Sequence, residues 1–417
     1  MNEFLTSSVP EHRTTSGWQI ALIKIGVVVA LPGFLTGAEI GSQLGLGAAA
    51  GAIIAGCAVL ALICALTGTV AATSRLPTAT ITKFAFGRDG AKVVNAVLAV
   101  TLIGWFAVTV ELFARALLGI FENAASGLLW NPFFVLAGGT LMVLTTLFGF
   151  RALSVLSRWA VPLMLLVLVV MAIMTATRTS LGELLVVPEN PTSLGVAISA
   201  VIGGPAAGIV IFPDISRFAR SVNHGRAAAV MSYGIGMPLI LLSVGVTAMA
   251  TGEKDLVLVM LGLGLGIPAL VFLVLTAWTT NAGNLYSGTI FLSSLLQRLP
   301  YRQVAAIAGA AGIGVALMGL TDYFVPFLVT LGITVPPIAG IYVTDFFLRG
   351  KKYDLGKQDS GRPVRLAALL GWATGVGTAY ATAGGTLTLT GVPACDSILV
   401  SAAVFFALSR LLPQDSG

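Results

Sequence analysis

The sequence predicts an all-α, polytopic membrane protein that forms a single transmembrane domain over residues 1–417. Composition is the first reason. Of the 417 residues, 57% are hydrophobic and 10% are charged, whereas a soluble protein carries about 25% charged residues. The mean hydropathy of +0.97 agrees, and the 49 glycines are typical of membrane helices that pack closely. Membrane topology, rather than nucleic-acid binding, then accounts for the net charge of +6.

The second reason is the number of long apolar segments. A membrane-spanning helix needs about 20 mostly apolar residues, and the chain contains twelve candidates. In order they are residues 18–40, 46–73, 92–120, 131–149, 154–176, 194–212, 227–251, 257–282, 303–320, 324–347, 364–384 and 391–412. The first ten divide into two halves of five, about 18–176 and 194–347, and two further helices follow within 364–412.

The third reason is the distribution of positive charge. Cytoplasmic loops of membrane proteins carry an excess of Lys and Arg. With twelve spans and both termini in the cytoplasm, 20 of the 23 Lys and Arg fall on the cytoplasmic side, Lys24 among them. Only Arg115, Arg178 and Lys254 remain outside. We therefore expect a multi-pass protein of the plasma (inner) membrane with both termini cytoplasmic.

Two of the apolar segments are interrupted near their middle. The first contains Pro32-Gly33, and the sixth contains Gly203-Gly204-Pro205. Proline removes a backbone donor and glycine leaves helical geometry at low cost. Prolines also kink membrane helices for packing alone. However, breaks five spans apart lie in helices of opposite direction, and such a pair indicates the midplane site of a secondary transporter with inverted repeats.

A polar stripe crosses the eighth apolar segment. Thr276, Thr279 and Thr280 share one helix face, and Asn281 and Asn284 follow them. A single threonine can satisfy its hydroxyl on a carbonyl three or four residues back, so the cluster matters more than any member. Threonine oxygens and the carbonyls of a broken helix are neutral donors suited to Na⁺. The amide of Asn281 suits the edge of a heteroaromatic ligand.

These segments resemble a known family. "AWTTNAGNLYSG" is similar to the helix-8 signature of bacterial cytosine permeases, members of the nucleobase:cation symporter-1 family. "FAFGRDG" resembles the family's loop after helix 2, "IGWFAVTVELFA" its helix 3, "DISRFAR" the end of helix 6 and "VPPIAGIYVTDFFL" its helix 10. The resemblance implies a LeuT-like architecture of twelve helices, in which the first ten form two inverted repeats with helices 1 and 6 broken.

The resemblance also implies roles for individual residues. The cation site would use the carbonyls of Gly26 and Val29 with the side chains of Thr276, Thr279 and Thr280. In the substrate site, Trp105 would stack on the base and Asn281 would read its edge. The remaining substrate-site residues implied are Gly203, Gly204, Pro205, Ala207, Phe34 and Asn284.

The sequence departs from the cytosine permeases at the substrate site. Leu102 stands where those proteins have glutamine, and the break "GGPAAG" lacks their aromatic residue and serine, so that Phe34 or Phe212 would have to supply a second stacking wall. Thr276 stands where they have asparagine. We expect import of a cytosine-type pyrimidine or related heteroaromatic by Na⁺ or H⁺ symport. A purine, a hydroxymethylpyrimidine- or thiamine-like compound and a hydantoin- or allantoin-like compound remain alternatives, as does a non-transporting membrane sensor.

Two carboxylates within the spans are further candidates. Glu111 lies in the third segment, where Arg115 is one turn away, and Glu39 lies at the end of the first; each has either a structural role or a part in proton coupling. An enzyme is not expected, because His12 and His224 lie outside the spans and no carboxylate pair lies within one turn inside a span. No nucleic-acid or obligatory protein partner is expected.

Overall fold

The computed structural model describes residues 4–5, 7–120, 130–319, 330–350, 353, 355, 363–387 and 389–411. In this part of the chain the structure is helical, with one isolated backbone bridge between Thr15 and Ala219. The longer helices are α1 (Gly17–Val28), α2 (Leu31–Ser74), α4 (Arg88–Ile120), α5 (Trp130–Thr146), α6 (Phe150–Ala176), α12 (Met237–Thr251), α14 (Gly266–Leu295), α15 (Tyr301–Leu317), α17 (Pro336–Leu348), α18 (Leu366–Ala383) and α19 (Pro393–Leu411). Shorter helices are η1 (Glu11–Arg13), α3 (Thr78–Phe86), α7 (Leu181–Leu185), α8 (Leu194–Gly203), α9 (Ala206–Val210), α10 (Pro213–Ser216), α11 (Val222–Ala229), the π-helix η2 (Val230–Gly236) and α13 (Leu256–Gly262).

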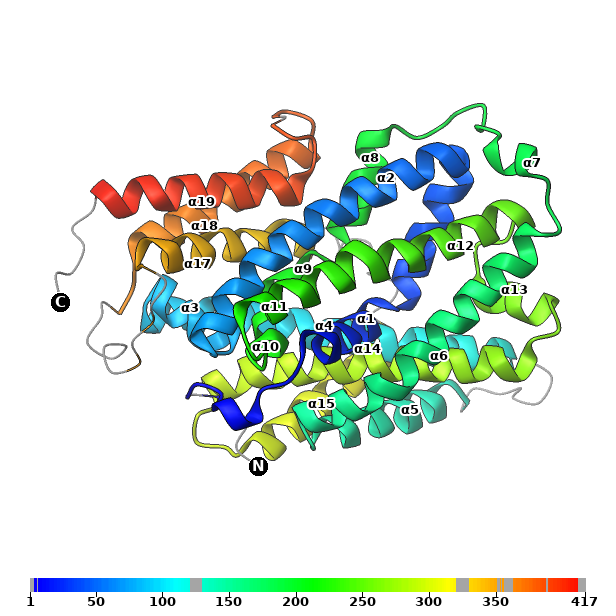
Figure 1. Cartoon of the computed structure of the whole chain (residues 1–417). Coiled ribbons are helices and arrows are strands. Elements are labelled where there is room, and N and C mark those ends of the chain that lie inside the picture. Colours follow the sequence, from blue (N-terminus) through cyan, green and yellow to red (C-terminus); the bar gives the residue numbers. More distant parts are fainter. Residues whose placement is uncertain are drawn as a thin grey trace.

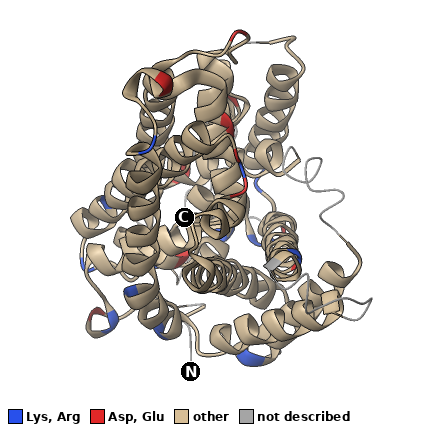
Figure 2. Ribbon diagram, turned by 90° about the vertical axis from the view of Figure 1, so that its right-hand side faces the viewer, with Lys and Arg blue, Asp and Glu red and all other residues tan. Residues whose placement is uncertain are grey.

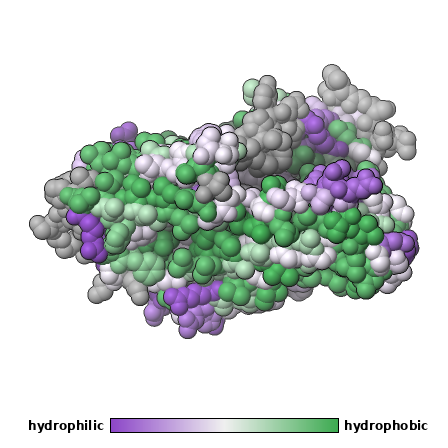
Figure 3. All heavy atoms as spheres, turned by 90° about the horizontal axis from the view of Figure 1, so that it is seen from above, coloured by the Kyte–Doolittle hydropathy of each residue, from purple (hydrophilic) through white to green (hydrophobic). Residues whose placement is uncertain are grey.

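Most helices run roughly along one axis, which is horizontal in Figure 1. Among the described residues, seven helices are long and apolar enough to cross a membrane, and eight if the bent pair formed by Leu194–Gly203 and Ala206–Ser216 counts as one span. Charged residues are sparse on the ribbons when the molecule is viewed from the end that carries α7 and α13 (Figure 2). The surface seen from above is largely hydrophobic, with smaller hydrophilic patches toward its ends and along its lower edge (Figure 3). The predicted class of all-helical membrane protein agrees with these features.

Several predicted segment boundaries differ from the structure. Segments 18–40 and 46–73 are not separated by a loop, because α2 runs from one into the other with a kink at Gly45, whose φ is +70°. Segment 257–282 is divided: α13 ends at Gly262, the chain turns at Gly264 with φ +79°, and α14 continues to Leu295. The threonine stripe therefore lies in the middle of α14 rather than at the end of a span. The start of segment 324–347 lies outside the described residues, and Thr330–Leu348 is largely helical.

The helical structure is interrupted at both sequence positions predicted to break it, Pro32-Gly33 and Gly203-Gly204-Pro205. α1 ends at Val28, and α2 begins at Leu31 with Pro32 in its first turn. α8 ends at Gly203 and α9 begins at Ala206, with Pro205 at the N-cap, and the two helical parts are bent by 52°. Proline at the start of a helix is favourable because the missing N–H would have no partner there. Pro32 and Pro205 therefore lie at the start of the helix that follows each interruption.

The first half of α2 packs against α12 through glycines. A Cβ added at Gly41 would lie 2.6 Å from the carbonyl oxygen of Gly245, and one at Gly37 would lie 2.8 Å from the carbonyl oxygen of Leu241. The two backbones are therefore in direct contact, as small residues allow in membrane helices. This contact fixes the position of the helix that follows the first interruption.

Replacing Gly41 by Leu should destabilise the protein, because the new side chain must push α2 and α12 apart. Overpacking of this kind costs about 1–3 kcal/mol or more. The matched control is Gly47→Leu, on the same helix, where an added Cβ meets nothing within 4 Å. Thermal unfolding of the two purified variants should show a lower melting temperature for Gly41→Leu alone. Equal melting temperatures would contradict the close packing.

Candidate functional site

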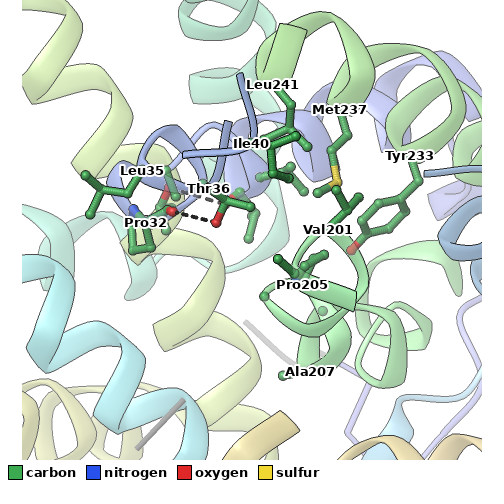
Figure 4. Close-up of a pocket in the computed structure, with 18 of the residues that line it drawn as sticks. Pro32, Leu35, Thr36, Ile40, Val201, Pro205, Ala207, Tyr233, Met237 and Leu241 are labelled. Carbon is green, nitrogen blue, oxygen red and sulfur yellow. Dashed lines mark hydrogen bonds between the residues drawn. The ribbon is translucent and has the colours of Figure 1, made fainter. Parts of the chain in front are cut away.

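A cavity of about 370 Å³ lies where α1 gives way to α2 and α8 gives way to α9. Its wall includes residues of α1, α2, α4, α8, α9, η2, α12 and α14. Pro32, Leu35 and Thr36 lie on one side in Figure 4, and Val201, Pro205, Ala207 and Tyr233 lie on the other. The lining is mostly apolar with a few polar groups, as is usual for small-molecule sites. Both interruptions therefore contribute to one space, although they are separated by more than 170 residues.

The structure places several predicted substrate residues at this cavity. Trp105 of α4 lines it, and so does Leu102, one turn earlier on the same helix. Gly204, Pro205 and Ala207 line it from the second interruption. The α4 face thus offers an indole ring and an aliphatic side chain, and the α8–α9 connection offers only backbone, a proline ring and a methyl group.

On α14 the cavity is lined by Thr280 and Asn284, and Asn281 is not among the lining residues. Residues four apart lie about 40° from each other around a helix, whereas Thr280 and Asn281 lie about 100° apart. The Asn281 amide nitrogen instead donates to the carbonyl oxygen of Phe106, at 3.3 Å, and to the sulfur of Met142, at 3.1 Å. The predicted contact between Asn281 and the substrate edge therefore does not match its position, and Asn284 is the asparagine at the cavity.

Phe34 and Gly203 were also predicted to form the substrate site, and neither lines the cavity. The ring of Phe34 instead packs against Phe272, with ring centroids 5.5 Å apart. Phe212 is fully buried and lies against Gly68 instead. The second aromatic residue that lines the cavity is Tyr233, from η2.

A cluster of oxygens lies beside the cavity, between α1 and α14. The hydroxyl oxygen of Thr280 is 3.2 Å from the carbonyl oxygen of Val29, 3.3 Å from that of Val27 and 3.5 Å from that of Gly26. The last four carbonyls of an α-helix have no partner within that helix. One hydroxyl proton serves one carbonyl at a time, so the cluster holds more acceptors than donors. Such a set of neutral oxygens is chemically suited to a hard monovalent cation.

The other two predicted threonine ligands are placed differently. The Thr279 hydroxyl donates to carbonyls of its own helix, at 2.9 Å from Leu275 and 3.2 Å from Thr276, and its Cβ lies 3.4 Å from the position of a Cβ at Gly26. It lies next to the oxygen cluster with its lone pairs still available. The Thr276 hydroxyl contacts the sulfur of Met164 on α6, at 3.5 Å. Thr276 was predicted to bind the cation, but its hydroxyl is engaged with α6 rather than with the α1 carbonyls.

Lys24 and Tyr233 are among the cavity residues that the sequence analysis did not propose. Lys24 was assigned to the cytoplasmic excess of positive charge, and this is wrong: the side chain is 1% exposed and lines the cavity. Its position inside an apolar run, two residues before Gly26, was the signal that could have found it, because an ionisable residue within a span is a functional candidate. No pattern in "VMSYGIGMPL" distinguishes Tyr233 from a packing residue.

The two carboxylates singled out in the sequence both have partners. Glu39 lines the cavity, accepts from Gln43 at 2.7 Å and pairs with Lys254 at 2.9 Å. Glu111 is 2% exposed and pairs with Arg115 at 2.7 Å. Among the described residues, no group of three or more His, Cys, Asp or Glu side chains is arranged to hold a metal ion.

A cavity between two interrupted helix pairs of an apolar, all-helical protein is the arrangement of a membrane transporter. The fold matches that of Mhp1, a nucleobase-cation-symport-1 family transporter in a closed conformation with bromovinylhydantoin bound. The TM-score is 0.82 at 21% identity, with 97% of this chain and 94% of Mhp1 covered. A Na⁺-coupled sialic acid symporter in a substrate-bound outward-open state matches with a TM-score of 0.70 at 11% identity, over 95% of this chain and 90% of the symporter.

The chain belongs to the family of permeases for cytosine/purines, uracil, thiamine and allantoin, whose family model matches residues 8–362. The cytosine permease of Escherichia coli (strain K12) is 27% identical over 415 residues, which is 99% of this chain and 95% of that protein. The hydantoin permease of Microbacterium maritypicum is 25% identical over 362 residues, 81% of this chain and 74% of that protein. The resemblance read from the sequence is confirmed, and the protein is a transporter rather than an enzyme.

The cavity should admit water-soluble reagents. In a Cys395→Ser background, the Thr36→Cys variant should react with a polar maleimide at least about tenfold faster than the Ala38→Cys variant, because only an accessible thiolate reacts. Thr36 lines the cavity, and Ala38 is fully buried two residues further on. Cys57 and Cys64 are buried and should contribute little background. Mass spectrometry measures the labelling. Similar labelling rates for the two variants would contradict the accessibility of the cavity.

Proposed function

We propose that the protein is a secondary active transporter that imports a nucleobase or related heteroaromatic compound together with a cation. The observation that carries the proposal is the cavity itself. It joins both helix interruptions, has the Trp105 indole in its wall and lies next to the oxygen cluster around Thr280. Freed backbone groups are tolerated in an apolar protein where they line a wet space or hold a ligand.

The substrate ring is expected to pack against Trp105, with Asn284 offering both a donor and an acceptor to its edge. Stacking of a flat heteroaromatic ring on an indole adds about 1 kcal/mol to the gain from buried area. A cytosine-type pyrimidine remains the first candidate. Leu102 at the cavity wall offers no hydrogen bond, which keeps purines, hydroxymethylpyrimidine- or thiamine-like compounds and hydantoin- or allantoin-like compounds as alternatives.

The coupling ion is proposed to be Na⁺, with H⁺ as the alternative. The carbonyls of Gly26, Val27 and Val29 with the hydroxyl of Thr280 supply hard, neutral oxygens, and Thr279 lies beside them. A cation there would bridge the end of α1 to α14. It would hold the interrupted helix in the conformation that binds substrate, which couples the two ligands through one helix.

Transport is proposed to follow alternating access in a twelve-helix, LeuT-like arrangement of two inverted repeats, with interrupted helices 1 and 6. The expected location is the cell inner membrane, with both termini in the cytoplasm. This orientation rests on the excess of Lys and Arg in the segments assigned to that side.

Uptake of radiolabelled bases into proteoliposomes tests the proposal. Cytosine, uracil, hypoxanthine and hydantoin would be compared, each with an inward Na⁺ gradient. Trp105→Ala should reduce uptake of the transported base at least about tenfold, because stacking and buried area are both lost. Trp159→Ala is the matched control, since Trp159 is 78% exposed on the outer surface of α6. Binding without uptake by the unmodified protein would indicate a sensor, and equal uptake by both variants would refute the role of Trp105.

Replacement of Thr280 by Val should abolish stabilisation by Na⁺. The two side chains have nearly the same shape, so the change removes one oxygen from the cluster. The unmodified protein should melt at a higher temperature in NaCl than in choline chloride, by an amount that grows with the logarithm of Na⁺ concentration. Thr289→Val is the control, because Thr289 is buried in the same helix and its hydroxyl donates to the carbonyl oxygen of Leu285, one turn earlier. A Na⁺ effect that survives in Thr280→Val would exclude this site.

A further inference from the structure

The cavity contains a buried lysine whose hydrogen-bond and ring contacts within the described part of the chain are with neutral groups. Lys24 of α1 donates from Nζ to the carbonyl oxygen of Gly208 in α9, at 2.8 Å. Its ammonium also lies 5.5 Å from the centre of the Tyr233 ring. Both Gly208 and Tyr233 line the same cavity. One carbonyl and one ring face satisfy part of the hydrogen-bonding capacity of an ammonium, which has three donors.

Among the described residues no carboxylate forms an ion pair with Lys24. Glu39, which also lines the cavity, is already paired with Lys254. The Asp214 carboxylate accepts from the backbone nitrogen of Thr78, at 2.8 Å. The charge of Asp214 acts on Lys24 through space, but the two form no ion pair. A buried ammonium without a directly bound counter-charge is unfavourable, and none of the described side chains provides one to Lys24 at the cavity.

Tyr233 provides an independent observation. Its side chain is fully buried, and its hydroxyl has no hydrogen-bond partner among the described residues. In Figure 4 the Tyr233 side chain extends toward Val201 and Pro205 at the cavity. A buried hydroxyl without a partner is uncommon and calls for a ligand or water.

The lysine and the tyrosine meet at Gly208. A Cβ placed on Gly208 would lie 2.7 Å from Lys24 Nζ and 2.9 Å from the Tyr233 hydroxyl. Because Gly208 has no side chain, both donors approach its backbone and lie close to each other at the cavity wall. An acidic group that reaches them from the cavity can accept from both, since hydrogen bonds from an ammonium or a phenol to an anion span about 2.5–2.9 Å.

We propose that the substrate is an anionic heteroaromatic compound, whose acidic group accepts hydrogen bonds from Lys24 and Tyr233 beside Gly208 while its ring packs toward Trp105. This proposal rests on the proposed function and specifies its substrate class. The acidic group is a ring carboxylate or a deprotonated ring imide. A charge-assisted pair is about twice as strong as a neutral hydrogen bond, so a neutral base of the same shape binds more weakly.

Matched ligand pairs test the proposal in the purified full-length protein. The probes are uracil against uracil-6-carboxylate and nicotinamide against nicotinate, with Kd measured by calorimetry in sodium gluconate. In at least one pair the acid should bind about tenfold or more tightly than its neutral partner. Lys24→Met should weaken the acid about tenfold and leave the neutral compound within about threefold. Lys92→Met, which removes an exposed lysine whose partner Asp89 also lies outside the cavity wall, should leave the preference unchanged.

Further variants separate recognition from a structural role. Tyr233→Phe should weaken the acid alone, and Gly208→Ala should do so by displacing Lys24 Nζ and the Tyr233 hydroxyl. Lys24→Met without ligand should melt at a higher temperature than the unmodified protein, because the unpaired buried charge is gone. A lower melting temperature would show that Lys24 is a structural anchor for α9 and would overturn the proposal.

The remaining outcomes also decide between hypotheses. If cytosine, uracil, hypoxanthine or hydantoin is taken up while the acids do not bind, the anionic-substrate proposal is wrong and the transport function stands. If Lys24→Met keeps the acid preference, the anionic-substrate proposal is also wrong. If chloride in place of gluconate stabilises the unmodified protein but not Lys24→Met, the site takes an inorganic anion, and the proposal is also wrong. If no heteroaromatic compound binds or is taken up, the proposed function fails together with it.

Discussion

The structure depends on one constraint: in an apolar protein, backbone groups released from a helix must find partners. Two of the helix interruptions, between α1 and α2 and between α8 and α9, leave backbone groups without helical partners. Both interruptions line the same cavity. Around them the packing is tight. α2 and α12 touch backbone to backbone at Gly41, and α14 presents Thr280 to the last carbonyls of α1. The irregular backbone at these two interruptions lies where a ligand can complete its hydrogen bonding.

The end of α1 serves two neighbouring sites because of its helical geometry. Lys24 and Gly26 are two residues apart and so lie about 200° apart around the helix. One side presents an ammonium to the cavity and to α9, and the other presents carbonyls to α14. A ligand on either side therefore acts on the position of the same short helix. This gives a physical basis for coupling a cation to a substrate, with both ligands favouring one arrangement of α1.

The sequence predicts those features that depend on composition and local chemistry. Proline and glycine mark both interruptions, and the predicted Trp105 and Thr280 lie at the cavity. The sequence alone does not predict features that depend on which face of a helix a residue occupies or on tertiary packing. Asn281 and Asn284 look equivalent in sequence, yet only Asn284 lines the cavity, and Phe34 packs on Phe272 instead. Lys24 was assigned by counting charges, although its apolar neighbours on both sides mark it as part of a span.

The most direct measurement is an experimental structure of the purified protein in Na⁺ with its transported compound bound. We expect ring density against Trp105, between the α1–α2 and α8–α9 interruptions, and an ion among the oxygens of Gly26, Val27, Val29 and Thr280. Unbroken helices through Pro32 and Pro205, with the compound bound elsewhere, would contradict the link between interrupted backbone and transport on which the other conclusions depend.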